Sequence, residues 1–441
     1  MNVNYAFFEK TDGSFESFQK KLVQFGIKIY TAGDFDDMFD LNVEIKKSGE
    51  SDFKGIDLVV LEMPGENQKL EESYILNSIE PWKIAAVYSC VKNYRNSVIV
   101  IDPDDFDKII ESLEECGDVT LQDRRMFSLK ALYRLLRYNS SIHREMSELF
   151  ASEKFETLIL EEKSPLRYGE NPQQLAYLTK IAKTNAFFDP FDEDTLAGLS
   201  YNNIVDIHLA LSLLKYLNDS FAVRVHHGII VDVRKKHFDF KSSRGVLAAN
   251  FINDELIEGL KGNDLDIVML PEMPDLSKSG IRKFIKIKEI PSVEVEKEYR
   301  FMDGNFLIQT PDDLSNMKFL SDEFDVQYKF ANIVAALSRS MACCIFRDYE
   351  LMSISAGQAE QIDALETTLR KAEKKSMNLD GSVCAFDGPI KDIEVVNHVI
   401  GTGIKTIIEP GGVKEDRIVK KQLEENGIEL IFSGRRRYKI S

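Results

Sequence analysis

The sequence predicts an α/β protein, because short apolar runs typical of buried strands alternate with helical segments along most of the chain. Two such runs, IDLVVLEM and SVIVIDP, lie at 56–63 and 97–103. The segment 104–117 begins with acidic residues, carries an i, i+3, i+4 apolar stripe and ends at a glycine, which predicts a helix. A second helical pattern runs from 122 to about 150. These observations predict one α/β domain over residues 1–155.

The same alternation continues through residues 156–441, where we expect a second region with two subdomains that meet near 310–325. Strand-like runs occupy 220–225, 244–250, 266–272, 342–348, 350–355, 405–410 and 429–434. Helical patterns cover 324–340 and 415–427, and no repeat of solenoid spacing is present.

Composition narrows the classes of function. The chain has 441 residues with a net charge of −17, so it lacks the global basic field that nucleic-acid binding favours. A small anionic substrate needs only a local pocket of basic groups and backbone N–H donors. The N-terminus is polar, and no apolar run approaches the roughly 20 residues that span a bilayer, so we expect a cytoplasmic protein with no membrane partner. The cysteines have no ligand spacing, and we expect no metal site.

Five polar stretches could carry chemistry, although each alone is more often structural. They are SPLRYGENPQQ (164–174), LSYNNIVDIHLAL (199–211), SISAGQ (353–358), EPGGVKEDR (409–417) and FSGRRRY (432–438). The first could be a surface loop, the second a capped helix start, and the third and fourth tight strand-to-helix turns.

In this order, the five stretches resemble the bifunctional purine biosynthesis enzyme family, which joins an IMP cyclohydrolase to an AICAR transformylase. The resemblance covers most of 160–441 and, more weakly, 85–106. It implies a methylglyoxal-synthase-like N-terminal domain followed by two cytidine-deaminase-like units without zinc. It also implies formyl transfer from 10-formyltetrahydrofolate to the 5-amine of AICAR, in active sites that form across a homodimer interface.

The resemblance assigns binding roles to polar residues in these stretches. Arg167 would pair with the nucleotide phosphate, and Tyr168 would offer a ring and a hydroxyl beside it. Asn203 would meet the carboxamide of AICAR. The remaining candidates are Gly169 and Asn171 in the loop, Gln358 and Asp363 toward the folate, and Arg436 near the C-terminus, for which a solvated basic tail is an equal alternative.

Two histidines take the place of the Lys-His pair that the family carries at the end of a strand. His227 falls at the histidine position and can act as the general base, whereas His226 falls at the lysine position. Strand alternation would point their side chains to opposite faces. Lys236 and His237 form an alternative pair, and local packing of both histidines is the structural alternative.

Several positions depart from the family pattern. Gln173 replaces a histidine, Met341 replaces an asparagine, and KSSRG (241–245) replaces a Ser-Ala-Phe-Gly-Gly turn. In the N-terminal domain, Asp34 puts a carboxylate into the phosphate-binding turn, and the Lys-Thr-Leu-His-Pro segment is absent. Only Lys92, Asn93 and Glu80, in the place of an aspartate, remain there.

Three interpretations stay open. The first is a transformylase that has lost the cyclohydrolase activity. The second is a catalytically impaired paralogue that binds a purine nucleotide without turnover, and the third is a related enzyme that acts on another nucleotide.

Overall fold

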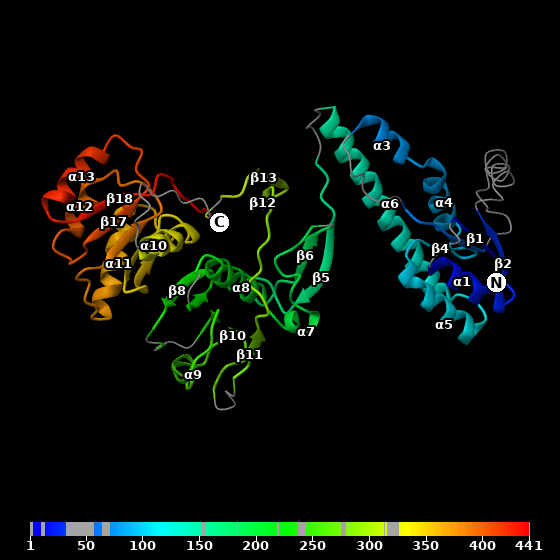
Figure 1. The fold of residues 1–441 in the computed structure, drawn as a ribbon, viewed down its shortest axis with the longest axis horizontal. Coiled ribbons are helices and arrows are strands. Elements are labelled where there is room, and N and C mark those ends of the chain that lie inside the picture. Colours follow the sequence, from blue (N-terminus) through cyan, green and yellow to red (C-terminus); the bar gives the residue numbers. More distant parts are fainter. Residues whose placement is uncertain are drawn as a thin grey trace. The chain divides into compact units, whose positions relative to one another are not determined.

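A computed structural model of the chain divides into two compact units, Met1–Leu160 and Glu161–Ser441 (Figure 1). The structure describes residues 3–9, 14–31, 57–63, 71–150, 156–182, 184–217, 220–236, 238, 244–274, 279–312, 314 and 326–440. The α/β class predicted from the sequence is confirmed in both units.

The first unit is built on a parallel sheet with the strand order β2-β1-β3-β4. The strands are β1 (Tyr5–Phe8), β2 (Lys28–Thr31), β3 (Leu58–Val60) and β4 (Val98–Val100). The helices are α1 (Ser14–Gln24), α3 (Glu72–Ser78), α4 (Pro81–Lys92), α5 (Phe106–Cys116) and α6 (Leu121–Leu149), and the 3-10 turn η2 (Pro103–Asp105) precedes α5. The helices predicted near 104–117 and 122–150 are therefore present.

Both faces of this sheet are buried, as the continuous apolar runs of its strands require. Phe8 packs on one face with residues of α1 and α5, and the neighbouring Phe7 packs on the other with residues of α4 and α6. Gly117 ends α5 with a φ of 69°, a left-handed conformation that glycine adopts without a steric penalty.

The second unit begins with the strand pair β5 (Leu160–Leu166) and β6 (Ala176–Ile181), followed by the short helix α7 (Glu193–Leu196) and by α8 (Tyr201–Leu214). A five-stranded sheet follows in the order β11-β10-β9-β7-β8. Its strands are β7 (Ala222–His226), β8 (Ile229–Arg234), β9 (Val246–Ala249), β10 (Ile267–Leu270) and β11 (Lys283–Lys286), with helix α9 (Asp254–Leu260) between β9 and β10.

The antiparallel hairpin β12 (Glu298–Met302) and β13 (Asn305–Gln309) precedes a second five-stranded sheet, whose order is β15-β14-β16-β17-β18. Its strands are β14 (Cys343–Arg347), β15 (Glu350–Ser355), β16 (Val383–Phe386), β17 (Thr406–Glu409) and β18 (Glu429–Phe432). The accompanying helices are α10 (Val326–Leu337), α11 (Gln361–Lys374), α12 (Ile393–Val399) and α13 (Asp416–Glu425).

The two five-stranded sheets share one topology. Each begins with an antiparallel hairpin, β7–β8 or β14–β15, whose first strand pairs antiparallel with β9 or β16. Each then continues with parallel strands to its far edge. A helix precedes each hairpin, α8 in the first case and α10 in the second, and both helices contribute to one hydrophobic core with residues of both sheets.

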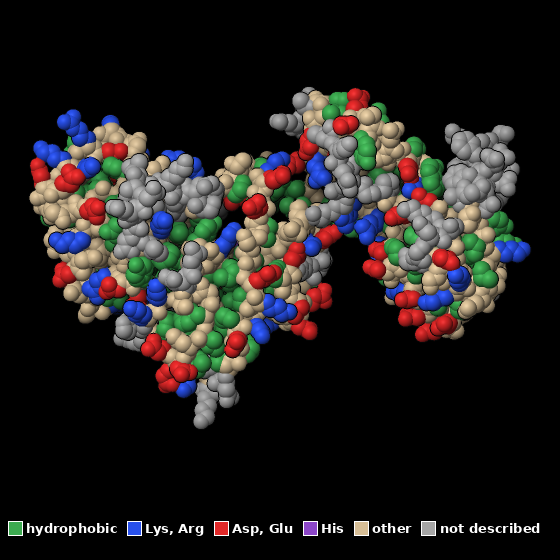
Figure 2. All heavy atoms as spheres, in the orientation of Figure 1, with side chains coloured by type: hydrophobic (Ala, Val, Ile, Leu, Met, Phe, Trp, Pro, Cys, Tyr) green, Lys and Arg blue, Asp and Glu red, His purple; other side chains and the backbone are tan. Residues whose placement is uncertain are grey.

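Charged side chains are scattered over the described surface among apolar and uncharged polar groups (Figure 2). Figure 2 shows acidic and basic groups interspersed over the face in view. None of the helices in the described ranges has the length and apolar character needed to cross a bilayer.

Candidate active site

The loop between β5 and β6 is closed by its own hydrogen bonds. The Gly169 N–H donates to the Gln174 carbonyl at 2.9 Å, and the Gln174 N–H donates to the Asn171 carbonyl at 3.0 Å. The Gln174 side chain accepts from the Asn171 N–H at 2.8 Å. A Cβ atom at Gly169 would lie 2.8 Å from the Cβ of Gln174, so this close approach requires glycine.

Arg167 and Tyr168 form a stacked pair on this loop. The Arg167 guanidinium lies 4.8 Å from the centre of the Tyr168 ring, and its Nη2 donates to the Tyr168 hydroxyl at 3.0 Å. Stacking fixes the plane of the guanidinium, and Arg167 is exposed. Arg167 can therefore present its N–H donors to a phosphate group.

The N-terminal end of α8 holds the loop in place. The Arg167 N–H donates to the Leu199 carbonyl at 2.8 Å, and the Tyr201 N–H donates to the Tyr168 carbonyl at 3.0 Å. The side chain of Asn202 donates to the Glu170 carbonyl at 3.1 Å. The loop and the first turn of the helix therefore form one hydrogen-bonded assembly.

Asn203 belongs to the capping box that starts α8. Its side-chain oxygen accepts from the Ser200 N–H at 3.0 Å and from the Ser200 hydroxyl at 2.9 Å. A ligand would therefore meet the amide N–H donors of Asn203 rather than its oxygen.

The two predicted catalytic histidines lie where β7 turns into β8. His226 is the last residue of β7 and pairs with Ile229, while His227 and Gly228 form the turn with φ values of 53° and 70°. The two imidazole rings lie 4.2 Å apart at 62°. The expectation that they point to opposite faces is wrong, because the chain leaves the extended conformation at His227 and strand alternation ends there.

The second turn of α8 contacts the same hairpin turn. The carboxylate of Asp206 accepts from the Gly228 N–H at 2.6 Å and from the His227 N–H at 3.1 Å. Burial raises the pKa of Asp206, while these two N–H donors and the charge of His227 act to lower it. Burial and the charge of His227 lower the pKa of His226, against the opposing charge of Asp266.

The candidates toward the C-terminus lie around the second five-stranded sheet. Gln358 follows β15 and exchanges two backbone hydrogen bonds with Met341, of 3.0 and 3.3 Å. Asp363 is exposed in the first turn of α11. The guanidinium of Arg436 stacks on Tyr438 at 4.7 Å, as Arg167 stacks on Tyr168. These three candidates are therefore positioned by a different sheet from the histidine turn.

Sequence reasoning missed two buried carboxyl groups at the carboxyl ends of adjacent parallel strands. Asp387 follows β16 and accepts from the Ala342 N–H at 3.0 Å. Glu409 ends β17 and accepts from the Gly411 N–H at 2.8 Å and from the Ile390 N–H at 3.3 Å. Burial raises the pKa of Asp387, and it raises the pKa of Glu409 to about 7. The only signal in the sequence is an acidic residue at the end of an apolar strand.

The positions that depart from the family pattern are described in part. Gln173 is exposed on the loop, and Lys236 is exposed with its N–H donating to the Glu350 side chain at 3.2 Å. Arg244 and Gly245 are the described residues of KSSRG. Its first three residues, His237 and Asp34 lie outside the described ranges.

In the first unit, the partly exposed Glu80 belongs to an ion cluster around the buried Lys83. Lys83 of α4 forms ion pairs with Glu80 and with Glu9, the latter at 2.6 Å, and donates to the Glu62 carbonyl at 2.8 Å. Glu9 and Glu62 lie just beyond the ends of β1 and β3, at the edge where open α/β sheets bind ligands. Lys92 is the last residue of α4, and Asn93 is its C-cap.

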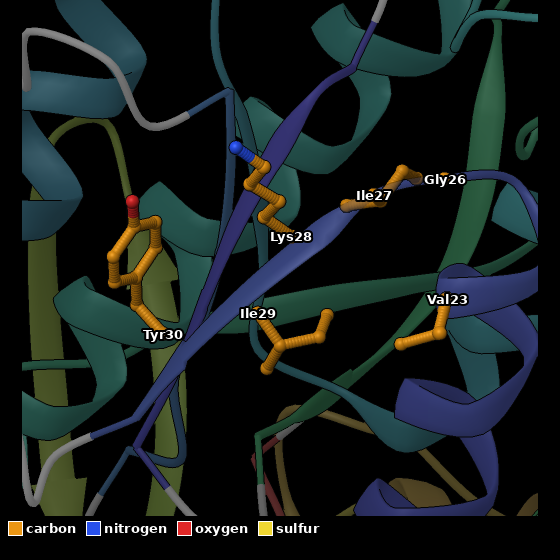
Figure 3. A pocket seen from close by; sticks show the side chains of 6 residues that line it. All are labelled: Val23, Gly26, Ile27, Lys28, Ile29 and Tyr30. Atoms are coloured by element: carbon orange, nitrogen blue, oxygen red, sulfur yellow. The ribbon is translucent and has the colours of Figure 1, made fainter.

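The first unit also has a hollow beside β2, shown in Figure 3. It is lined by Val23, Gly26, Ile27, Lys28, Ile29 and Tyr30. None of these residues belongs to the predicted site. Among the described residues, no group of three or more His, Cys, Asp and Glu is arranged to hold a metal ion.

The fold and the site define a two-unit α/β protein with a polar loop and a histidine turn gathered on one helix. The AICARFT/IMPCHase bienzyme family model matches residues 90–233. The PurH bifunctional purine biosynthesis protein of Persephonella marina is 27% identical over 90% of this chain and 84% of its own length. That of Aquifex aeolicus is 26% identical over 90% and 83%. These matches support a divergent, PurH-like chain that is similar to the curated purine biosynthesis proteins over most of its length.

One solved structure is also similar in part. The crystal structure of ForH covers 33% of this chain and 98% of its own, with 16% identity and a TM-score of 0.24.

Proposed function

We propose that the second unit transfers the formyl group of 10-formyltetrahydrofolate to the 5-amine of AICAR. The observation that carries the proposal is the assembly on α8, which joins the Arg167–Tyr168 pair to the His226–His227 turn. On the AICAR side, the reaction needs an arginine that binds the phosphate and a histidine that accepts the amine proton.

In the proposed reaction, His227 takes the proton that the AICAR amine loses as its nitrogen attacks the formyl carbon. The bond from that carbon to the folate nitrogen then breaks, and the folate nitrogen receives a proton. Arg167 and Tyr168 hold the phosphate, assisted by the fixed loop around Gly169 and Asn171, and Asn203 donates to the carboxamide. Arg436, Gln358 and Asp363 are proposed contacts of the nucleotide and the folate.

The buried carboxyl groups of the second sheet fit a folate ring. Asp387 Oδ2 and Glu409 Oε1 are buried without a hydrogen-bond partner among the described residues. A pterin edge carries both N–H donors and ring acceptors. A buried carboxyl group can meet either kind, as an acceptor when ionised and as a donor when protonated, and leaving it unpaired costs free energy. The co-substrate would therefore find polar partners at the carboxyl ends of β16 and β17.

The experiment is a folate difference-absorbance assay with AICAR, run beside calorimetric titration of AICAR. A general base contributes about 10²–10⁴-fold, so His227→Ala should lower formyl transfer by that factor and leave AICAR affinity nearly unchanged. His226→Ala should lower formyl transfer by a smaller factor. The matched control His398→Ala, which changes a histidine on α12, should leave formyl transfer unchanged.

The alternatives give different outcomes. Binding of AICAR without turnover would support the impaired paralogue, and neither binding nor turnover would support a related enzyme with another nucleotide. Full turnover in His227→Ala together with loss in Lys236→Ala would move the catalytic role to the Lys236–His237 pair.

We also propose that the active protein is a homodimer with sites shared between subunits, as in the family. Apolar side chains around the loop support this, since Leu175 is 90% exposed and Tyr177 is 54% exposed. Their burial by a second copy would favour association. Light scattering at micromolar concentration is the test, and a monomer there would contradict both the dimer and the shared site.

For the fold, we propose a methylglyoxal-synthase-like domain over 1–155 and two deaminase-like subdomains over 156–441. The division into units at Leu160 and the common topology of the two five-stranded sheets support this assignment. The cyclohydrolase activity of the first domain is proposed to be lost.

A further inference from the structure

The turn that carries His227 is held by a single buried carboxylate. Asp206 is 3% exposed, and its two oxygens accept from the consecutive N–H groups of His227 and Gly228. Consecutive N–H groups in a left-handed turn form a concave site that attracts an anion. Asp206 supplies that anion from within the chain, so it fixes the turn against α8.

The second five-stranded sheet offers an internal comparison. The turn between β14 and β15 also has two left-handed residues, Asp348 with φ 53° and Tyr349 with φ 65°. There the Tyr349 N–H donates to the side-chain oxygen of Gln327 at 2.9 Å, and Gln327 lies on α10, the helix that precedes this hairpin. A neutral amide is therefore sufficient to hold a turn of this kind. The negative charge at Asp206 calls for a different explanation.

That charge acts on the histidine. Asp206 and His227 interact electrostatically in addition to the backbone hydrogen bond. A negative charge beside the turn would stabilise positive charge that develops on the imidazole during proton transfer. The other charged groups near the turn are His226, whose ring lies 4.2 Å away, and Asp266. The charges of Arg224 and Arg244 contribute to lowering the pKa of His226.

We propose that Asp206 is a positioning residue for formyl transfer, which holds the His227 turn through two N–H groups and stabilises the imidazolium that forms when His227 takes the amine proton. The inference rests on the proposed function. It adds that α8 positions both parts of the site. Its first turn holds the Arg167–Tyr168 loop, and its second turn holds His227.

The experiment compares Asp206→Asn with Gln327→Ala, the matched change at the second hairpin. The first readout is amide hydrogen exchange at His227 and Gly228, with His227→Ala used for assignment. An amide oxygen accepts more weakly than a carboxylate, so both N–H groups should exchange faster in Asp206→Asn, by about tenfold. Gln327→Ala should leave both exchange rates unchanged.

The second readout is kinetic. Asp206→Asn should lower kcat by about tenfold or more at neutral pH with little change in KM for AICAR, because the nucleotide contacts are kept. Should Asp206→Asn fail to fold, Asp206→Gln places the acceptor of the second hairpin at this position and takes its place in both readouts.

Two outcomes would overturn the inference: unchanged exchange at His227 and Gly228 in the folded variant, or equally faster exchange there in Gln327→Ala. The exchange result does not depend on turnover. An inactive parent protein would therefore overturn the proposed function alone, and the exchange rates would still decide whether Asp206 holds the His227 turn.

Discussion

At the scale of single residues, Glu409 stands out because a carboxyl group that is wholly buried must lose its charge or be compensated. One of its oxygens accepts two backbone N–H bonds, from Gly411 and Ile390. The pKa of Glu409 is raised to about 7, chiefly by burial and in part by the nearby charge of Asp416, against the opposing effect of the two N–H donors. Glu409 therefore keeps its proton in the folded protein at pH values where the unfolded chain has lost it.

This difference predicts a pH-dependent stability. Because the folded pKa lies above the unfolded value, the stabilising contribution is complete below about pH 4.5 and is lost as pH rises through about 7. The loss amounts to roughly 3 kcal/mol at most. Glu409→Gln should remove this dependence, so the variant should be more stable than the parent at pH 8 and similar to it at pH 5.

Urea unfolding at a series of pH values measures the effect. The control is Glu424→Gln, an exposed carboxyl group on α13, which should leave the pH dependence unchanged. If Glu409→Gln kept the same slope of unfolding free energy against pH as the parent, the proposed protonation of Glu409 would be wrong.

At the scale of elements, the sequence predicts those strands and helices that bury an apolar face. The predicted apolar runs contain the strands β3, β4, β9, β10, β14, β15, β17 and β18, and β7 extends one residue beyond its run. The hairpin β12–β13 has no such signal, because Phe301, Phe306 and Leu307 are all more than half exposed and mark no buried face. Periodicity predicts an element only where one of its faces is covered.

The same limit applies to the site. Arg167 and Tyr168 are neighbours in the chain, so a motif suffices to place them together. Asp206 and the His227 turn meet only because α8 packs beside β7, and no local pattern encodes that contact. The sequence does not predict the left-handed conformation of His227 either, because glycine and asparagine are the residues typical of such turn positions.

At the scale of the whole molecule, the two units differ in what lies at the carboxyl ends of their parallel strands. In the second unit, Glu409 and Asp387 present oxygens without partners among the described residues. In the first unit, Lys83 binds Glu9, Glu80 and the Glu62 carbonyl, so its three N–H donors are all engaged. Glu80, the remaining acidic residue of the family pattern, is committed to this cluster rather than to a substrate.

The last prediction follows for the first unit. Ring closure of the formylated nucleotide joins the carboxamide nitrogen to the formyl carbon and releases water, which requires a free acid or base beside the substrate. Glu80 is paired to Lys83, and the family resemblance puts Asp34 at the position of the phosphate-binding turn, so we expect no IMP from the purified protein beyond the uncatalysed rate. Supplying the formylated nucleotide and following IMP formation measures this, with a bifunctional relative as the positive control. Closure well above the uncatalysed rate would show that the cyclohydrolase activity persists. Its absence would mean that a separate dehydrating cyclase must take up the product of the second unit.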